Sequence, residues 1–163
     1  MNPVGELLNL DDIALDVDVS SGTALLQRAA AMLARRSHLI EAEVLASLTA
    51  REELGSTALG HGIAIPHARM AQCGASAGVL VRTRFAIPFN APDTKPVSIF
   101  LGLIVPKQAN ERHLKLLATA AEMFSDRSFR EKIRACAESS QALELLAQWP
   151  DGSGPQVRES LSV

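Results

Sequence analysis

The chain is poor in the residues and runs that mark secreted and membrane proteins. Its only cysteines, Cys73 and Cys136, form neither a CxxC pair nor a metal-ligand spacing, so we expect free reduced thiols. No stretch approaches the ~18 consecutive apolar residues of a membrane span. The start of the chain has no basic segment followed by a long apolar run. We therefore expect a cytoplasmic protein.

An excess of charge of one sign is also missing. Sixteen Lys and Arg residues stand against eighteen Asp and Glu residues, which leaves a formal net charge of −2. Such a chain has no overall field that attracts nucleic acid or an anionic membrane, so partners must be recognised by local surface. With 163 residues, 47% of them hydrophobic, the chain suits one domain with one core.

Three catalytic motifs are absent. The sequence has no HExxH pair of zinc ligands, no GxSxG elbow of a serine hydrolase and no GxxxxGK[ST] loop that would hold a nucleotide. We therefore predict no cofactor and no metal. If the protein accepts a phosphoryl group, the missing nucleotide loop favours a donor other than ATP.

Hydrophobic periodicity predicts helices that alternate with strands. Leu8 to Val19 is expected to be largely irregular, Ser56 to Gly62 a Gly-rich connection and Pro88 to Pro96 a loop. Strands are predicted at Ala14 to Val17, Ile63 to Ile65, Val79 to Phe85 and Val97 to Val105, the last being apolar enough for a buried central strand. Helices are predicted at Thr23 to Arg36, Ala42 to Leu54, Asn110 to Phe124, Ser128 to Ala137 and Ser140 to Trp149.

This order of elements predicts an α/β fold, a single-domain sandwich with a mixed central β-sheet covered by helices on both faces. The helix over Asn110 to Phe124 is expected to turn Leu114, Leu117, Ala121 and Phe124 inward. Residues 1–149 should form the domain, and residues 150–163, which begin with a Pro- and Gly-rich stretch, a flexible polar tail.

The segment from Gly62 to Arg69, GIAIPHAR, places His67 after a short apolar strand and directly behind Pro66. Proline fixes its own φ near about −65° and biases the preceding residue toward extended geometry, so the strand should hold the imidazole at a defined angle. An imidazole titrates near a pKa of ~6.5, so a ring nitrogen can attack a phosphoryl or acyl centre without a strong base. His67 is therefore predicted to be a nucleophile.

Two other histidines fit a site less well. His38 follows two arginines at a predicted helix end, where a cation or a capping donor is ordinary. His61 precedes His67 by six residues, which along an extended strand is ~20 Å and too far for one shared metal ion. Neither His61 nor His67 has an acidic or cysteine ligand nearby, so a metal site is only a remote alternative.

His113 falls in the first turn of a predicted helix, where unpaired backbone N–H groups favour an anion. It also follows the end of the apolar run Val97 to Val105, and ligands gather where strands of α/β sheets end. His67 is likewise expected at the exit of a strand. A first-turn histidine is nevertheless more often a surface or core-edge residue, so the residues alone leave its role open.

A phosphoryl group on His67 needs cationic or hydroxyl partners. Arg51 and Arg69 flank the segment, and Ser56 and Thr57 offer hydroxyls. Each also has an ordinary role, as a solvated charge or as part of a turn, and for Arg69 the surface role is favoured.

Two ordered blocks carry a family resemblance. The run from Arg51 to His67, REELGSTALGHGIAIPH, and the later LIVP at Leu103 with HLKLL at His113 resemble enzyme IIA domains of the bacterial phosphotransferase system, fructose/mannitol class, and most closely the nitrogen-regulatory member. The likeness spans roughly Leu7 to Trp149. It implies that His67 accepts a phosphoryl group on Nε2 from an HPr-like phosphohistidine protein, that His113 is a second active-site histidine and that Arg51 stabilises the phosphate. His61 departs from the family pattern, which usually has asparagine there.

The resemblance implies a cytoplasmic phosphocarrier whose phosphorylation state regulates partners in potassium transport, sensor-kinase signalling or nitrogen and carbon control. The lack of a fused membrane or sugar-phosphorylating domain favours this hypothesis. One alternative is a sugar-specific enzyme IIA that passes phosphate to a IIB partner. The other is a non-catalytic binding module in which His67 is only a rigid surface residue.

Overall fold

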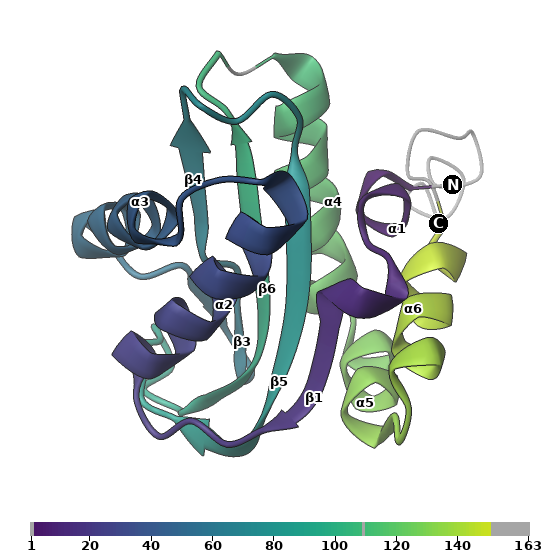
Figure 1. Ribbon diagram of the computed structural model, residues 1–163. Helices are drawn as coiled ribbons and strands as arrows, with labels where there is room; N and C mark the ends of the chain where they lie inside the picture. The colour runs from purple at the N-terminus through teal and green to yellow at the C-terminus, as the bar shows by residue number, and fades with distance from the viewer. Residues whose placement is uncertain (1, 109, 151–163) are drawn as a thin grey trace.

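The protein is an α/β sandwich built around one mixed sheet, seen in the computed structural model of residues 2–108 and 110–150 (Figure 1). The strand order is β1-β5-β6-β3-β2, and β4 pairs with β6 as well. The strands are β1 (Ile13–Val17), β2 (Ala58–Gly60), β3 (Ile63–Ala64), β4 (His67–Met70), β5 (Ala77–Ile87) and β6 (Val97–Pro106).

Helices cover both faces of this sheet. α2 and α3 pack on one face, while α1, α4, α5 and α6 lie on the other (Figure 1). The predicted fold class is therefore confirmed. The helices are α1 (Pro3–Leu7), α2 (Gly22–Ser37), α3 (Glu41–Leu54), α4 (Glu111–Ser125), α5 (Arg127–Ala135) and α6 (Ser139–Gln148), with a short 3-10 turn, η1, at Leu10–Asp12.

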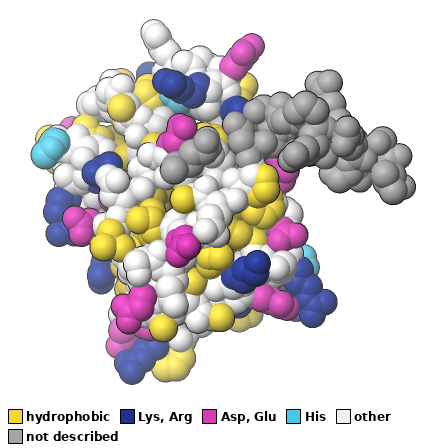
Figure 2. Space-filling model, turned by 90° about the vertical axis from the view of Figure 1, so that its right-hand side faces the viewer, with side chains coloured by type: hydrophobic (Ala, Val, Ile, Leu, Met, Phe, Trp, Pro, Cys, Tyr) yellow, Lys and Arg dark blue, Asp and Glu magenta, His cyan; other side chains and the backbone are white. Residues whose placement is uncertain are grey.

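The outer surface mixes charges of both signs on the α1 and α6 side of the molecule. Figure 2 shows Lys and Arg side chains interspersed with Asp and Glu side chains and with apolar ones on this face. This distribution agrees with the small net charge of −2, and this face carries no broad region of one sign.

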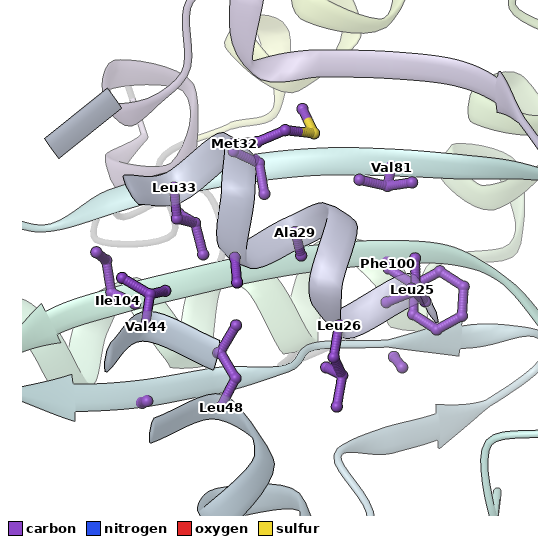
Figure 3. Packing of buried hydrophobic residues seen from close by; sticks show 14 of the residues in the cluster. Leu25, Leu26, Ala29, Met32, Leu33, Val44, Leu48, Val81, Phe100 and Ile104 are labelled. Carbon is purple, nitrogen blue, oxygen red and sulfur yellow. The ribbon is translucent and has the colours of Figure 1, made fainter. Parts of the chain in front are cut away.

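α2 follows the predicted helix closely, because its caps and its apolar stripe agree. The Ser21 hydroxyl accepts a hydrogen bond from the Ala24 N–H at the start, and His38 ends the helix with a left-handed φ of 56°. His38 is thus a helix-capping residue, as expected. Figure 3 shows the inner side chains of α2 and α3 over the sheet: Leu25, Ala29, Leu33, Val44 and Leu48 face Val81, Phe100 and Ile104.

β6 is the central strand, as its apolar run predicted. Parallel β3 and β4 lie along one edge of it, and antiparallel β5 lies along the other. Leu101, Leu103 and Ile104 are fully buried. A strand that is covered on both faces needs apolar side chains on both, which explains the unbroken run.

Three details of the histidine segment differ from the prediction. The expected connection at Ser56 to Gly62 contains strand β2, the expected strand at Ile63 to Ile65 ends at Ala64, and His67 begins β4 instead of leaving a strand. Pro66 causes the break, because it has no N–H to give to a ladder. Its carbonyl still accepts from the Leu103 N–H at 2.9 Å, so β4 resumes along β6.

The beginning of the chain holds more structure than expected. The segment predicted as largely irregular contains η1, and α1 precedes it. Asn2 is fully buried and ties α1 to α6: its Nδ2 donates to the carbonyls of Leu146, at 2.7 Å, and Trp149, at 3.0 Å, and its Oδ1 caps α1 at Gly5. α1 and α6 therefore lie side by side (Figure 1).

The buried face of α4 also differs from the prediction. Leu114 is 58% exposed, whereas His113, Leu116, Ala120 and Met123 point into the core together with Phe124. The choice of Leu114 failed because the helix is rotated to bury His113. Cys73 and Cys136 are buried and free, as expected. The predicted tail at 150–163 falls, apart from Pro150, outside the described residues.

Candidate functional site

His67 is held by the backbone just before its strand. Its Nδ1 lies 2.7 Å from the carbonyl oxygen of Ile65, two residues before it. A carbonyl can only accept a hydrogen bond, so Nδ1 carries the ring proton and donates it. The lone pair is therefore on Nε2. The hydrogen bond to Ile65 thus fixes both the tautomer and the orientation of the ring, which is partly buried.

Burial lowers the pKa of His67 below its usual value of 6.5, since a charged imidazolium loses solvation there. The hydrogen bond to Ile65 acts in the opposite direction and is the second influence. The charges of Arg51 and Arg69 lower the pKa further, and that of Glu52 raises it. The net result is a ring that is neutral at pH 7, which is the nucleophilic form.

Arg51 lies near the site, and a hydrogen bond restrains its side chain. It belongs to the last turn of α3, and its Nη1 donates to the carbonyl of Gly55 at 2.8 Å, which caps that helix. Its charge still acts on His67, more strongly than that of Arg69. Arg69 is exposed in β4 and matches its predicted surface role.

The two hydroxyls proposed as phosphate donors have structural partners instead. Ser56 Oγ donates to the Phe89 carbonyl at 3.0 Å, and Thr57 Oγ1 donates to the Glu52 carboxylate at 2.6 Å. Their hydroxyl protons are therefore already used. The two hydroxyls therefore have structural roles, but residues 56 and 57 follow a bend at Gly55 and do not form the expected turn.

Glu52 is the residue that the sequence analysis missed. Its carboxylate accepts from both the N–H and the hydroxyl of Thr57, and the Thr57 carbonyl accepts from the Ile65 N–H at 3.0 Å. Ile65 in turn holds His67. A glutamate in the last helical turn, followed after a glycine by Ser-Thr, is the only sequence signal for this chain of bonds.

His113 is 9% exposed and is held by the start of α4. The backbone N–H of Asn110 donates to His113 Nδ1 at 3.3 Å, and the Asn110 side chain accepts from the His113 N–H. This reciprocal pair is a capping box. Because Nδ1 accepts, the proton of a neutral His113 is on Nε2, which is then a hydrogen-bond donor.

The sheet register places the two histidines on the same face. His67 is opposite Leu103 in the parallel pairing of β4 with β6, and alternation puts its side chain on the side of Ile63 and Ile65. That is the face covered by α4, whose first turn buries His113 inward. Both imidazoles thus lie on the α4 face toward the carboxyl end of β6.

A pocket of about 590 Å³ opens beside His113. α1 contributes Glu6 and Leu7 to its wall, and the loop before β5 contributes Ser76. His67 is not part of the wall. Within residues 2–108 and 110–150, no three His, Cys, Asp or Glu side chains are grouped so that they could hold a metal ion.

Comparison with known proteins assigns the chain to a family. The family model for the phosphoenolpyruvate-dependent sugar phosphotransferase system, EIIA 2, matches residues 6–149. The chain belongs to this family. As an EIIA domain it is a phosphotransfer component, which gives it a general transferase role.

Relatives of this EIIA chain include nitrogen regulatory proteins. One from Bradyrhizobium diazoefficiens is 32% identical over 148 residues, which cover 91% of this chain and 97% of the relative. The crystal structure of nitrogen regulatory protein IIA-Ntr from Neisseria meningitidis is 42% identical with a TM-score of 0.85, covering 88% and 98%. The Escherichia coli IIA mannitol structure, at 21% identity and a TM-score of 0.73 over 86% and 99%, shares the fold.

None of the helices described for this EIIA chain is both long and apolar enough to cross a membrane.

Proposed function

We propose that this protein is a nitrogen-regulatory EIIA that accepts a phosphoryl group on Nε2 of His67 from an HPr-like phosphohistidine protein. The observation that carries the proposal is the hydrogen bond from Nδ1 to the Ile65 carbonyl, because it leaves Nε2 as the nucleophilic nitrogen. The lowered pKa of His67 supports it, since the ring needs no base to remove a proton.

The transfer then balances as an exchange between two imidazoles. The Nε2 lone pair of His67 forms the new N–P bond, and the electron pair of the old N–P bond returns to the donor histidine. Positive charge develops on the His67 ring during attack, and the Nδ1–H bond to Ile65 becomes stronger as it does. Positioning and charge stabilisation carry this reaction, as in other phosphoryl transfers.

His113 and Arg51 are proposed to stabilise the transferred group. An Nε2–H donor on His113 suits a phosphoryl oxygen, and the shared face of the sheet supports its role. Arg51 would contribute positive charge, a role supported by its lowering of the His67 pKa. Because its Nη1 is bonded to the Gly55 carbonyl, Arg51 would act on the phosphoryl group mainly through its charge and less by direct contact.

The phosphorylation state is proposed to regulate partner proteins, in potassium transport, sensor-kinase signalling or nitrogen and carbon control. The identities to nitrogen regulatory proteins, 32% over 91% of this chain and 42% over 88% of it, support this branch over the sugar-specific one. A sugar-specific EIIA uses the same His67 chemistry, but its next step is transfer to a IIB partner.

The test is to incubate the chain with phosphoenolpyruvate, enzyme I and an HPr-like carrier, and to follow the acid-labile phosphate by intact mass. We expect one phosphoryl group on the wild type and none on His67→Ala. His38→Asn and His61→Asn are matched controls, since asparagine tolerates the left-handed φ of both positions, and they should label fully. Undiminished labelling of His67→Ala would refute the site, and rapid onward transfer to a IIB domain would favour the sugar-specific function.

A further inference from the structure

A second pocket lies at the other end of the sheet, away from His67. The turn between β2 and β3 holds His61 and Gly62, and the Gly62 carbonyl accepts from the N–H groups of Ser98 and Ile99, early in β6. His67 is opposite Leu103, five residues after Ser98, a separation of roughly 17 Å along the strand. A pocket of about 420 Å³ opens beside this turn.

Cations surround this pocket. α5 turns Arg127, Arg130 and Arg134 toward it, at positions that recur on one helical face, and Lys95 lines it from the loop before β6. The one carboxylate in the wall, Glu131, pairs with Arg127 Nε at 3.1 Å, and both of these side chains are largely exposed. Asp93 stands close by, but its carboxylate accepts from the N–H groups of His61 and Lys95.

Arg130 is fixed at the wall of this pocket by the end of α4. The residue is only 7% exposed, and its Nη1 donates to the carbonyls of Phe124 and Ser125 at the end of α4. Its Nε is buried and has no hydrogen-bond partner. These bonds to the end of α4 fix the guanidinium at the wall of the pocket, while Nε stays inside the protein and is not available to a ligand there.

Arg134 contacts the turn directly. Its Nη2 donates to the carbonyl of His61, and a Cβ built on Gly62 would come within 2.8 Å of the same nitrogen. Gly62 also has a φ of 79°, so only glycine suits this position. Burial, and after it the neighbouring charge of Arg130, lower the pKa of Arg134, as expected for two cations that line the same pocket.

We propose that this pocket binds the diphosphate group of a small phosphorylated ligand. The volume of about 420 Å³ falls in the range of small-molecule pockets. Arg127 and Arg134 are seven positions apart, which separates them by ~10 Å along the helix axis, longer than a single phosphate can contact. Several adjoining acceptor oxygens match these arginines, Lys95 and the Ser98 hydroxyl.

The proposal does not depend on phosphoryl transfer at His67. The pocket is cationic in a chain whose net charge is −2 and whose α1 and α6 side mixes both signs (Figure 2). It gives His61, which has no place in the phosphoryl site, a position in the wall of a ligand site. Ligand binding there would add a metabolite signal to the protein.

The experiment titrates the ¹⁵N-labelled chain with sodium pyrophosphate at constant ionic strength, with calorimetry for Kd. We expect saturable binding, with amide shifts concentrated at Gly62, Ser98 and α5. Lys95→Gln and Arg127→Gln should each weaken binding about tenfold, the worth of one charge-assisted hydrogen bond. Lys132→Gln removes a charge from α5 outside this pocket and should change Kd less than about twofold. His67→Ala should bind like the wild type.

Four results would overturn the proposal. They are the absence of saturation, an equal loss of affinity in Lys132→Gln, loss of binding in His67→Ala, and inorganic phosphate that binds as tightly as pyrophosphate. A hexaglutamate peptide serves as the protein-like competitor. If it binds more tightly than pyrophosphate, the pocket is a docking surface for an acidic protein segment instead.

Discussion

His67 and His113 are held in opposite tautomers by backbone groups. The Ile65 carbonyl takes the proton of His67 Nδ1, whereas the Asn110 N–H donates to Nδ1 of His113. The outer nitrogen of one ring is thus a lone pair, and that of the other is a proton donor. Such a pair suits the transfer of an anionic group to the first ring under stabilisation by the second.

The tautomers can be measured directly. Two-dimensional ¹H–¹⁵N spectra optimised for long-range ring couplings should show His67 protonated at Nδ1 and His113 protonated at Nε2 at pH 8. An Nε2-protonated His67 would contradict the assignment of the nucleophile. Asn110→Ala keeps the backbone N–H that bonds His113 and should not change either tautomer.

Two neighbouring residues should move the pKa of His67 in opposite directions. Arg51 lowers it and Glu52 raises it. In NMR titrations we therefore expect Arg51→Gln to raise the pKa and Glu52→Gln to lower it further. Arg69→Gln is the matched control, since its charge acts more weakly, and it should give a smaller rise than Arg51→Gln. A fall in Arg51→Gln would contradict the proposed field at the ring.

The stability of the fold should depend on pH through His67. Its folded pKa lies below the unfolded value of 6.5, so its contribution is complete above that value and is lost as pH falls through the folded pKa. Urea unfolding at several pH values between 8 and 5 should show a smaller acid loss in His67→Gln than in the wild type. If the free energy of unfolding fell equally with pH in both proteins, burial would not lower the pKa of His67.

Removing the second imidazole should slow transfer more than it destabilises the fold. In His113→Ala we expect phosphorylation about 10²-fold slower, the usual cost of one lost transition-state donor. Asn110→Ala loses a helix cap, worth ~1 kcal/mol, but keeps the imidazole, so it controls for local stability. Rapid-quench rates and urea unfolding of both variants separate the two effects. Transfer at the wild-type rate in His113→Ala would exclude its role.

Asn2 should matter far more to stability than its place at the chain start indicates. It is fully buried and makes three hydrogen bonds to α1 and α6. Asn2→Ala leaves buried carbonyls unpaired, and we expect a loss of about 2 kcal/mol in the free energy of unfolding. Gln148→Ala, which removes only an exposed contact to Glu144, should change it by less than ~0.5 kcal/mol. Similar values for both would show that α1 is not docked through Asn2.

The parts of the fold that follow from local pattern were predictable from sequence. α2 and β6 were found because caps, helical spacing and an unbroken apolar run each report a local cause. The face of α4 was not, because the cap between His113 and Asn110 buries a polar ring and rotates the helix away from Leu114. Hydrophobic periodicity alone predicts that the leucine, and not the adjacent histidine, is the buried residue.

The candidate site was predictable in its principal residue but not in its support. The position after Pro66 indicated an oriented His67, and the structure has that orientation. The bonds that produce it, from Glu52 through Thr57 to Ile65, join a helix end to a strand and leave no periodic trace. The strand was expected to end before Pro66, and the resumption of strand structure at His67 was missed; the Pro66 carbonyl keeps its bond to β6 although the N–H is absent.

The break at Pro66 also bears on how a phosphorylated state could be recognised. β3 and β4 are both anchored to β6 on either side of it, so the backbone beneath His67 is fixed when the chain folds. A phosphoryl group on Nε2 would then add negative charge above a backbone that is held by its pairing with β6. Partners would then distinguish the phosphorylated from the unphosphorylated protein by the electrostatic potential around His67, without a change in backbone conformation.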